Sequence, residues 1–390
     1  MIKTKHKSKK IGFCTLNGAK CINPLVKLLF KHVPMSIRSS QTPNQFFKVL
    51  TSLAIQKLSI HSIQRPGSNI PSENSLHHNL KKIDIGQLET ANHLMFAEQV
   101  KPFIIPGKKY SFAIDLTDDP YYGEKKGDYV VGGKRKASTN RFFSYATCYS
   151  IDGKRKFTIR VIPKSKNLSL IDYVFTFIKI IDELEVKVKV LCADREFYTH
   201  AVMCCLQSAK IPFIVPVKVQ GKRMKKLLKV QKSCCLEYVM SPQGKKPLRL
   251  DIAVCMNYLK GKKGKNGLEI HAFSVSGFTD PKKVSKMYER RFSIESSYRI
   301  RNTSKPRTSS KKPHVRYTII SFLIQNYWVT LQWKYFVIRQ KGPKIIDEDK
   351  FRFDTFKMIS WSYLKKLFRI PDGVITLSNI TRLNAKKLVT

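Results

Sequence analysis

The stretch KYSFAIDLTDD, residues 109–119, decides how this chain folds. Apolar residues lead up to Asp115 in the pattern of a buried strand. Two more strand-like runs follow, RFFSYATCYSI (141–151) and KRKFTIRVIP (154–163), and the Asp152-Gly153 pair between them is a strong hairpin signal. The region therefore begins with three successive strands.

An apolar helix and further strands follow this hairpin. LSLIDYVFTFIKIIDELE (168–185) has helical periodicity, and VKVKVLCAD (186–194) is a short β-branched run that ends in Asp194. A helix over 199–209 and the strand PFIVPV (212–217) complete a mixed sheet flanked by helices. The pattern predicts an α/β fold.

The rest of the chain divides around this sheet. Residues 1–105 have helical periodicity with a turn-rich piece between helices, as in a helix-turn-helix, which predicts an N-terminal helical domain; an ordinary small helical domain fits the pattern as well, and only the basic charge of the chain favours DNA contact. Basic residues and three strand-like runs in 218–279 predict an inserted β-rich subdomain. The core is then expected over 106–217 and 280–335, the latter with one helix over 280–301 and a core helix after it, followed by a C-terminal region over 336–390.

The charge of the chain indicates its partner. The 390 residues include 73 Lys and Arg against 27 Asp and Glu, a formal net charge of +46. A protein surface with this excess of positive charge favours a polyanionic partner, and nucleic acid is the first candidate. The longest uncharged run, 317–333, carries amides and hydroxyls and fits a buried helix better than a membrane span, and the N-terminus lacks the apolar region of a signal peptide. The nine cysteines show no C-x-x-C spacing, which indicates reduced thiols. We expect a cytoplasmic, nucleoid-associated protein without membrane contact.

In a chain this poor in acids, three carboxylates are informative. Asp115 and Asp194 each follow an apolar strand, and neighbouring strands bring such positions to one edge of a sheet. Glu295 lies in the helix over 280–301, with Tyr288, Arg291 and Arg299 on its face. Phosphodiester chemistry uses two divalent cations roughly 3.5 to 4 Å apart, and carboxylates are the ligands that Mg²⁺ prefers. The three acids therefore predict a two-metal site.

Each acid also has a simpler interpretation. Asp118 or Asp119 is an alternative ligand to Asp115, although Asp115 follows the apolar strand most closely. Asp194 is also placed to pair with Arg195, and Glu295 to pair with an arginine one turn away. The order of strand, strand and helix favours the metal site over these separate interpretations.

The order, spacing and flanks of the three acids resemble the DDE transposases of bacterial and archaeal insertion sequences, which have an RNase H-like catalytic core. The resemblance covers about residues 105–335. It rests on AIDLTDDPYYG around Asp115, on CADREF around Asp194, and on Tyr288-x2-Arg291-x3-Glu295, which is similar to the Y-x2-R-x3-E-x6-K signature of the subclass with a β-rich insertion before the glutamate. The final lysine of that signature falls on Asn302 here, so its phosphate contact is either lost or taken by Arg299, Arg301 or Lys305.

The resemblance implies a transposase that binds terminal inverted repeats, with residues 1–105 as a DNA-end-binding domain. It also implies that the protein cleaves the ends of its element by metal-dependent hydrolysis and joins the 3′-hydroxyl to target DNA, as a dimer on double-stranded DNA. It assigns Asp115, Asp194 and Glu295 as catalytic residues and as ligands of two Mg²⁺ ions, for which Mn²⁺ substitutes. The expected DNA contacts are Tyr288, Arg291, Arg299, Arg301, Lys305, Lys311 and Lys312. The alternatives are an RNase H-like nuclease without strand transfer and a non-catalytic or decayed DNA-binding protein.

Overall fold

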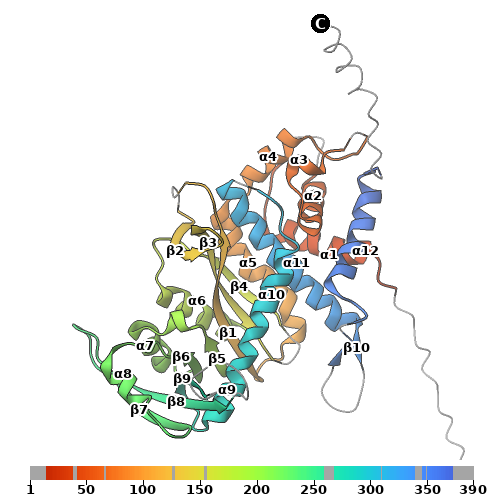
Figure 1. Ribbon diagram of the computed structural model, residues 1–390. Coiled ribbons are helices and arrows are strands. Elements are labelled where there is room, and N and C mark those ends of the chain that lie inside the picture. The colour runs from red at the N-terminus through yellow and green to blue at the C-terminus, as the bar shows by residue number, and fades with distance from the viewer. Residues whose placement is uncertain are drawn as a thin grey trace, which may run out of the picture.

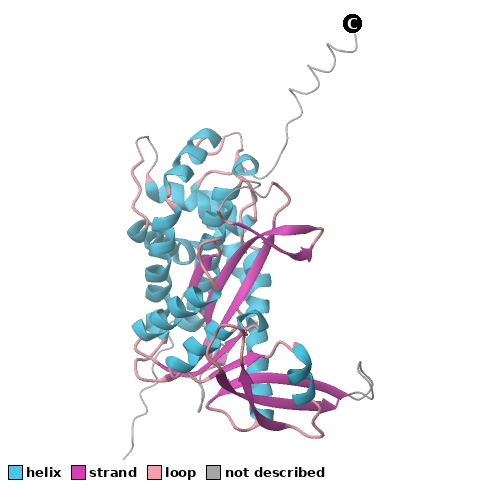
Figure 2. Ribbon diagram, turned by 90° about the vertical axis from the view of Figure 1, so that its left-hand side faces the viewer, coloured by secondary structure: helices cyan, strands magenta, loops and turns pink. Residues whose placement is uncertain are grey.

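The computed structural model describes residues 15–37, 42–65, 67–124, 128–152, 156–258, 268–308, 310–338, 345–347 and 349–371 (Figure 1). Helices from both ends of the chain gather at one end of the molecule, and the strands run from its middle to the other end. Figure 2 shows the strands as a twisted layer with helices packed against it. The α/β class predicted from the sequence is confirmed.

The N-terminal segment is helical, as predicted. It contains α1 (Gly18–His32), α2 (Pro43–Gln56), α3 (Ile60–Ile63), α4 (Glu73–Lys82), α5 (Ile85–Val100) and the 3₁₀ turn η1 (Lys101–Phe103). Side-chain caps explain where two of the helices begin. Thr42 and Gln45 form a reciprocal capping box at the start of α2, and the Asp84 carboxylate caps α5. These helices pack on α11 (Lys311–Tyr335), α12 (Phe353–Leu367) and β4 (Thr158–Pro163), and they share one hydrophobic core with the sheet.

The central sheet is built from the strands expected after residue 109. They are β1 (Lys109–Pro120), β3 (Thr139–Ser150), β4, β5 (Lys187–Ala193) and β6 (Phe213–Pro216), with α6 (Leu170–Glu183), the 3₁₀ turn η2 (Arg195–Phe197) and α7 (His200–Ser208) between them. β1, β5 and β6 are parallel neighbours, while β3 lies antiparallel between β1 and β4. The predicted hairpin of β3 and β4 is confirmed, although Gly153 of its turn lies outside the described residues.

The sheet is longer than the sequence indicated. An unpredicted strand, β2 (Val130–Lys136), pairs with β3 at one edge. At the other edge, β7 (Cys234–Met240), β8 (Leu248–Tyr258) and β9 (Leu268–Ser276) continue the order β2-β3-β1-β5-β6-β9-β8-β7. The three strands expected in the insertion are therefore present, but β9 pairs antiparallel with β6, so they extend the main sheet instead of forming a separate one. The basic start of the insertion is a helix, α8 (Gly221–Leu227).

The helix expected over 280–301 is divided. It consists of α9 (Pro281–Glu289), the 3₁₀ turn η4 (Arg290–Phe292) and α10 (Ser293–Asn302). The basic segment 301–316 contributes its first two residues to α10, which ends at Asn302, and its last six residues to α11, which begins at Lys311.

Helix α11 is the buried core helix that the apolar run predicted. Its side chains are buried over most of its length, and Asn326 ties two neighbours to it: its amide donates to Gln99 of α5 at 2.9 Å and accepts from the Thr158 amide of β4 at 2.8 Å. Two short strands, β10 (Val337–Ile338) and β11 (Ile345–Ile346), follow it. In the described parts of the chain, none of the helices combines the length and apolar character that a membrane span needs.

Candidate active site

The pairing of β1 with β5 brings two of the predicted acids together. The two strands are parallel, and their register pairs Ile114 with Ala193. The next residue on each strand is Asp115 and Asp194, so both carboxylates belong to the same edge of the sheet. Asp115 is within β1, which continues to Pro120, whereas Asp194 follows the last residue of β5. This is the arrangement that the positions of the acids predicted.

The third acid reaches this edge from α10, and an arginine lies among all three. The guanidinium of Arg291 places Nη1 3.3 Å from Asp115 Oδ1, and its Nη2 is 3.9 Å from Asp194 Oδ1 and 3.8 Å from Glu295 Oε1. The 3₁₀ turn η4 carries Arg291 and runs directly into α10, which carries Glu295 one helical turn later. The structure therefore gathers Asp115, Asp194 and Glu295 around one cation.

Exposure increases from Asp115 to Glu295. The side chains of Asp115 and Arg291 are 8% and 7% exposed, while those of Asp194 and Glu295 are 34% and 46% exposed. The Arg291 guanidinium also lies 5.2 Å from the ring centroids of Tyr288 and Phe292, at a distance typical of cation–π contacts. The site is thus closed on the β1 side and open to solvent on the α10 side.

The surroundings of Asp115 disfavour its charged form. Burial is the largest cause that raises the pKa of this carboxyl to about 7; Arg291 opposes the rise, and the nearby Asp194 and Glu295 carboxylates add to it. One guanidinium shared among three acids does not offset the loss of solvent around Asp115. An additional cation at this position would stabilise the ionised form.

Tyr298 supports the site from α10. Its hydroxyl lies 2.5 Å from Thr147 Oγ1, and Thr147 donates to the backbone carbonyl of Asp115 at 3.3 Å. Tyr298 is buried, and burial raises its pKa well above the usual value, so it stays a neutral hydroxyl. Sequence reasoning missed Tyr298 as a site residue, although its place one turn after Glu295 was the available signal.

The two residues considered as metal ligands in place of Asp115, Asp118 and Asp119, have other partners. Asp119 is buried, with Oδ1 2.9 Å from Arg301 Nη2 and Oδ2 2.9 Å from Lys305 Nζ and 3.4 Å from His314 Nε2. Although burial opposes it, the attraction of Arg301 and the bond to His314 hold the pKa of Asp119 far below its usual value. Asp118 accepts from Ser144 and pairs with Lys136 at 3.1 Å. Asp119 therefore ties β1 to α10 and α11.

This cluster changes the set of expected DNA contacts. Arg301 is 0% exposed and its guanidinium also lies 4.7 Å from the Phe322 ring centroid, so the prediction that Arg301 touches a DNA phosphate is wrong in this structure. Lys305 is mostly buried against Asp119. By contrast, Arg299 is exposed on α10, and Lys311 and Lys312 form the first turn of α11. Tyr288 is buried beside Phe273, with 4.9 Å between ring centroids.

The acids border a cavity of about 310 Å³. Among the described residues, no three His, Cys, Asp or Glu side chains come close enough together to bind a metal as they stand, because Arg291 lies between the acids. Their chemistry nevertheless fits a divalent cation: three carboxylates surround a positive group, and oxygen ligands suit Mg²⁺. Asp115, Asp194 and Glu295 are the residues that would hold the metal once the guanidinium moves aside.

Comparison with known proteins supports the assignment of the fold. No protein-family model matches the chain, and no curated protein matches it. A solved structure of similar fold is that of piggyBac transposase in a synaptic complex with hairpin DNA, with a TM-score of 0.54, 13% sequence identity, and coverage of 94% of this chain and 84% of that chain. At this identity the likeness concerns the fold. The chain thus has a transposase-like fold, and its mixed sheet is consistent with an RNase H-like core.

Proposed function

We propose that the protein is a metal-dependent DDE transposase of an insertion sequence, with Asp115, Asp194 and Glu295 as its catalytic acids. The observation that carries the proposal is the convergence of these three residues, which lie far apart in the sequence, around the buried guanidinium of Arg291. The similarity of fold to a transposase and the net charge of +46 support it.

The acids would hold two Mg²⁺ ions, with Mn²⁺ as a substitute. Metal bound there supplies Lewis-acid activation of the attacking oxygen and charge stabilisation of the leaving oxygen. Because the Arg291 side chain bears a planar fork of N–H donors, it can exchange its carboxylate partners for the oxygens of a DNA phosphate. Arg291 would then position the scissile phosphate beside Asp115, with Tyr288 holding the guanidinium from one side.

Two reactions in sequence would use this site. Water attacks the phosphorus at the end of the element, the bond to the 3′ oxygen breaks, and a 3′-hydroxyl is freed. That hydroxyl then attacks a target phosphodiester, and one P–O bond forms as another breaks, so no external energy source is required. A transposase acts on two ends, which implies a dimer on double-stranded DNA. Arg299 and the lysines that begin α11 would contact the backbone.

The test is incubation of the purified protein with Mg²⁺ and a duplex that carries the terminal inverted repeat flanking the coding sequence. We expect nicks at the repeat end followed by products joined to a second DNA. Nicks without joined products would identify a nuclease without strand transfer. Binding without any nick would identify a non-catalytic or decayed protein.

A further inference from the structure

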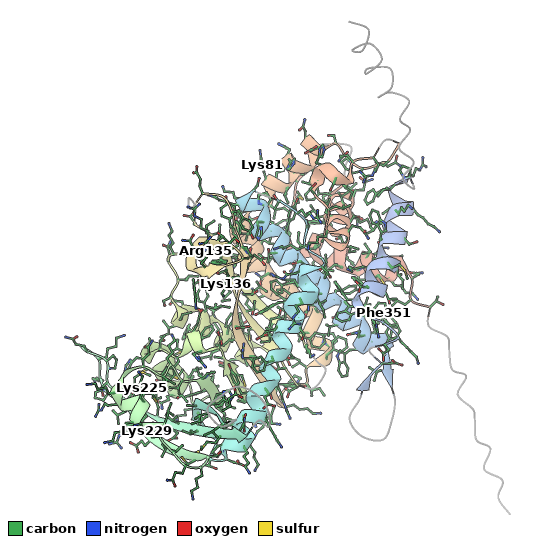
Figure 3. The ribbon with its side chains drawn as sticks, viewed as in Figure 1. Lys81, Arg135, Lys136, Lys225, Lys229 and Phe351 are labelled. Atoms are coloured by element: carbon green, nitrogen blue, oxygen red, sulfur yellow. The ribbon has the colours of Figure 1, made fainter. Side chains whose placement is uncertain are left out.

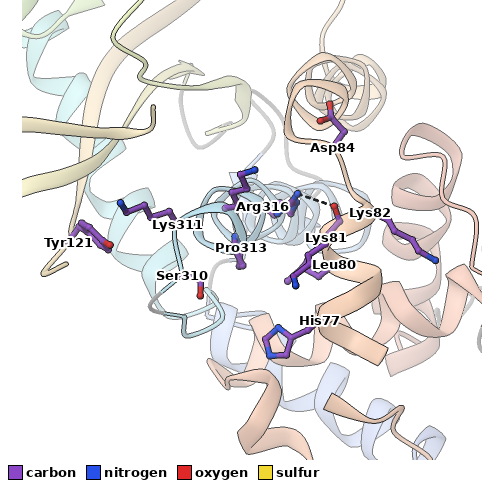
Figure 4. Close-up of a pocket in the computed structure, with 11 residues that line it drawn as sticks. His77, Leu80, Lys81, Lys82, Asp84, Tyr121, Ser310, Lys311, Pro313 and Arg316 are labelled. Carbon is purple, nitrogen blue, oxygen red and sulfur yellow. Dashed lines mark hydrogen bonds between the residues drawn. The ribbon is translucent and has the colours of Figure 1, made fainter. Parts of the chain in front are cut away.

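A second and larger cavity lies beside the active site. It has a volume of about 790 Å³ and lies between the end of α4 and the first turn of α11 (Figure 4). Its walls include Lys81 from α4, Lys311, Lys312 and Arg316 from α11, and Tyr121, which directly follows β1. We refer to it as the α4–α11 cleft. Its cations come from two parts of the chain that are more than two hundred residues apart.

The start of α11 favours an anion. This 25-residue helix begins with Lys311 and Lys312, has no acidic residue in its first turn, and receives no side-chain hydrogen bond from its N-cap residue Ser310. The N-terminus of a helix carries a partial positive charge, so anions there are stabilising. An anionic partner in the cleft would be attracted both by this helix end and by the Lys312 side chain.

The cleft is held in shape by a buried arginine. Arg316 is 4% exposed; its Nε donates to the Ile83 carbonyl at 2.6 Å and its Nη2 to the Lys81 carbonyl at 3.4 Å, which ties α11 to the end of α4. The acid at this wall, Asp84, already caps α5 through the Gln87 amide at 2.8 Å. Lys311 Nζ lies 5.6 Å from the centroid of the Tyr121 ring. The cleft is therefore a preformed basic surface.

The cleft and the active site are joined along one strand. The active-site cavity is lined by Asp115, Leu116, Thr117, Asp118 and Pro120, and Tyr121, the next residue, lines the cleft. Six residues of strand span about 20 Å, which equals about six base pairs of duplex at roughly 3.4 Å each. In the view of Figure 3, Lys81, Arg135 and Lys136 follow the same side of the molecule. Lys136 also lines the active-site cavity, so basic side chains lie both at the acids and at the cleft.

We propose that the α4–α11 cleft binds the phosphate backbone of the duplex whose cleavage site lies at the three acids, at a position about six base pairs from the cut. Lys81 and Lys312 are the two cations that would contact phosphates. The distance from the cut depends on the proposed function, whereas the binding of backbone in the cleft does not. The N-terminal helices and α11 would thus hold one stretch of DNA together.

Two exposed lysines outside the cleft provide a matched control. Lys82, which follows Lys81 on α4, also lines the cleft and is therefore left unchanged in both variants. Lys27 is exposed on α1 and Lys366 is exposed on α12, and neither lines the cleft. The double variant Lys81→Ala/Lys312→Ala and the control Lys27→Ala/Lys366→Ala therefore remove the same charge. Melting temperatures are compared first, and Lys81→Gln/Lys312→Gln replaces the alanine variant if that variant is unfolded.

The first measurement is the dependence of DNA affinity on salt, with the repeat-end duplex as the probe. Each phosphate contact contributes about −0.9 to the slope of log K against log salt concentration. Because the cleft variant lacks two of these contacts, its slope should be less negative than that of the unmodified protein by about 1.8. The control variant should keep the slope of the unmodified protein. Equal slopes in all three proteins would overturn the proposal.

The second measurement locates the contact. Duplexes with one uncharged methylphosphonate are tested at successive positions from the repeat end. We expect loss of affinity at about six base pairs from the cut with the unmodified protein, and no further loss with the cleft variant. If a methylphosphonate at this position also lowers the affinity of the cleft variant, the contact at this position is not made by Lys81 or Lys312. Mg²⁺-dependent cleavage by the same preparations separates the two proposals. If the unmodified protein cleaves DNA but the salt slopes of all the proteins are equal, the proposal for the cleft is refuted and the proposed function stands. If the slope of the cleft variant changes but the unmodified protein does not cleave, the proposed function is refuted and the binding of DNA backbone in the cleft stands.

Discussion

Arg291 Nη1 lies 3.3 Å from Asp115 Oδ1, and both side chains are more than nine-tenths buried. The other end of the same guanidinium faces Asp194 and Glu295. A buried charge without a partner is costly, so these four groups depend on one another. Arg291 therefore holds the acids together before any metal is present, and it lies where a phosphate and its counter-ions would have to enter.

Replacement of Asp194 by asparagine tests the metal site. Asp194→Asn keeps the size of the side chain and removes a charged ligand, so we expect Mg²⁺-dependent cleavage to fall by about a thousandfold or more, because metal ions supply several kcal/mol of transition-state stabilisation. Affinity for the repeat-end duplex should stay near that of the unmodified protein. Single-turnover cleavage and a binding titration measure the two quantities.

Asp118→Asn is the control for this prediction. Asp118 borders the same cavity but pairs with Lys136 and accepts from Ser144. Its replacement should leave most of the cleavage rate. Cleavage by Asp194→Asn at the rate of the control would mean that Asp194 is not a ligand.

Glu295→Gln and Arg291→Lys should fail in different ways. Glu295→Gln weakens a metal ligand on the exposed side of the site, so it should bind repeat ends normally, cleave slowly at any DNA concentration, and recover partly with Mn²⁺, which accepts similar oxygen ligands. Arg291→Lys keeps the charge but loses the planar fork, so it should weaken the end complex as well as cleavage. If both variants lose cleavage only in proportion to a lowered melting temperature, the two residues form a structural ion pair.

Asp119→Asn should destabilise the protein. The change leaves Arg301 with its charge buried and its main partner neutral, and the loss of one member of a buried pair costs about 3–5 kcal/mol. Since the pKa of Asp119 is held far below its unfolded value of 3.8, its contribution to the free energy of unfolding is complete above pH 3.8 and is lost as the pH falls toward the folded value. Denaturant unfolding of Asp119→Asn and Asp118→Asn measures the difference, and similar midpoints for both would contradict the anchoring role.

The raised pKa of Asp115 predicts pH-dependent metal binding. Without metal, the folded protein holds the proton of Asp115 more tightly than the unfolded chain does, so this group stabilises the fold most below pH 3.8 and progressively less as the pH rises to about 7. Mg²⁺ must displace that proton, so its affinity should increase about tenfold per pH unit below this pKa and level off above it. The rise in melting temperature caused by Mg²⁺ should be larger at pH 8 than at pH 6. Equal rises at both values would mean that Asp115 is ionised throughout.

Local patterns were sufficient for much of the fold and for the identity of the acids. Apolar runs that end in Asp115 and Asp194 predicted the strands β1 and β5, and helical spacing placed Glu295 near Arg291, because strand and helix periodicity depend on near neighbours in the chain. The parallel register that pairs Ile114 with Ala193 then brought the two aspartates to one edge, as their positions predicted.

Only the tertiary structure decided which charges are buried and which partners they have. The sequence left Asp119 open as a metal ligand and gave Arg301 a role in DNA binding, yet the two meet at 2.9 Å across the fold. Likewise β9 paired with β6, so that the strands of the insertion extend the main sheet, and α4 met the start of α11 to form a basic cleft. These outcomes depend on long-range pairing and on the cost of removing a charge from water, and neither is visible in the spacing of residues along the chain.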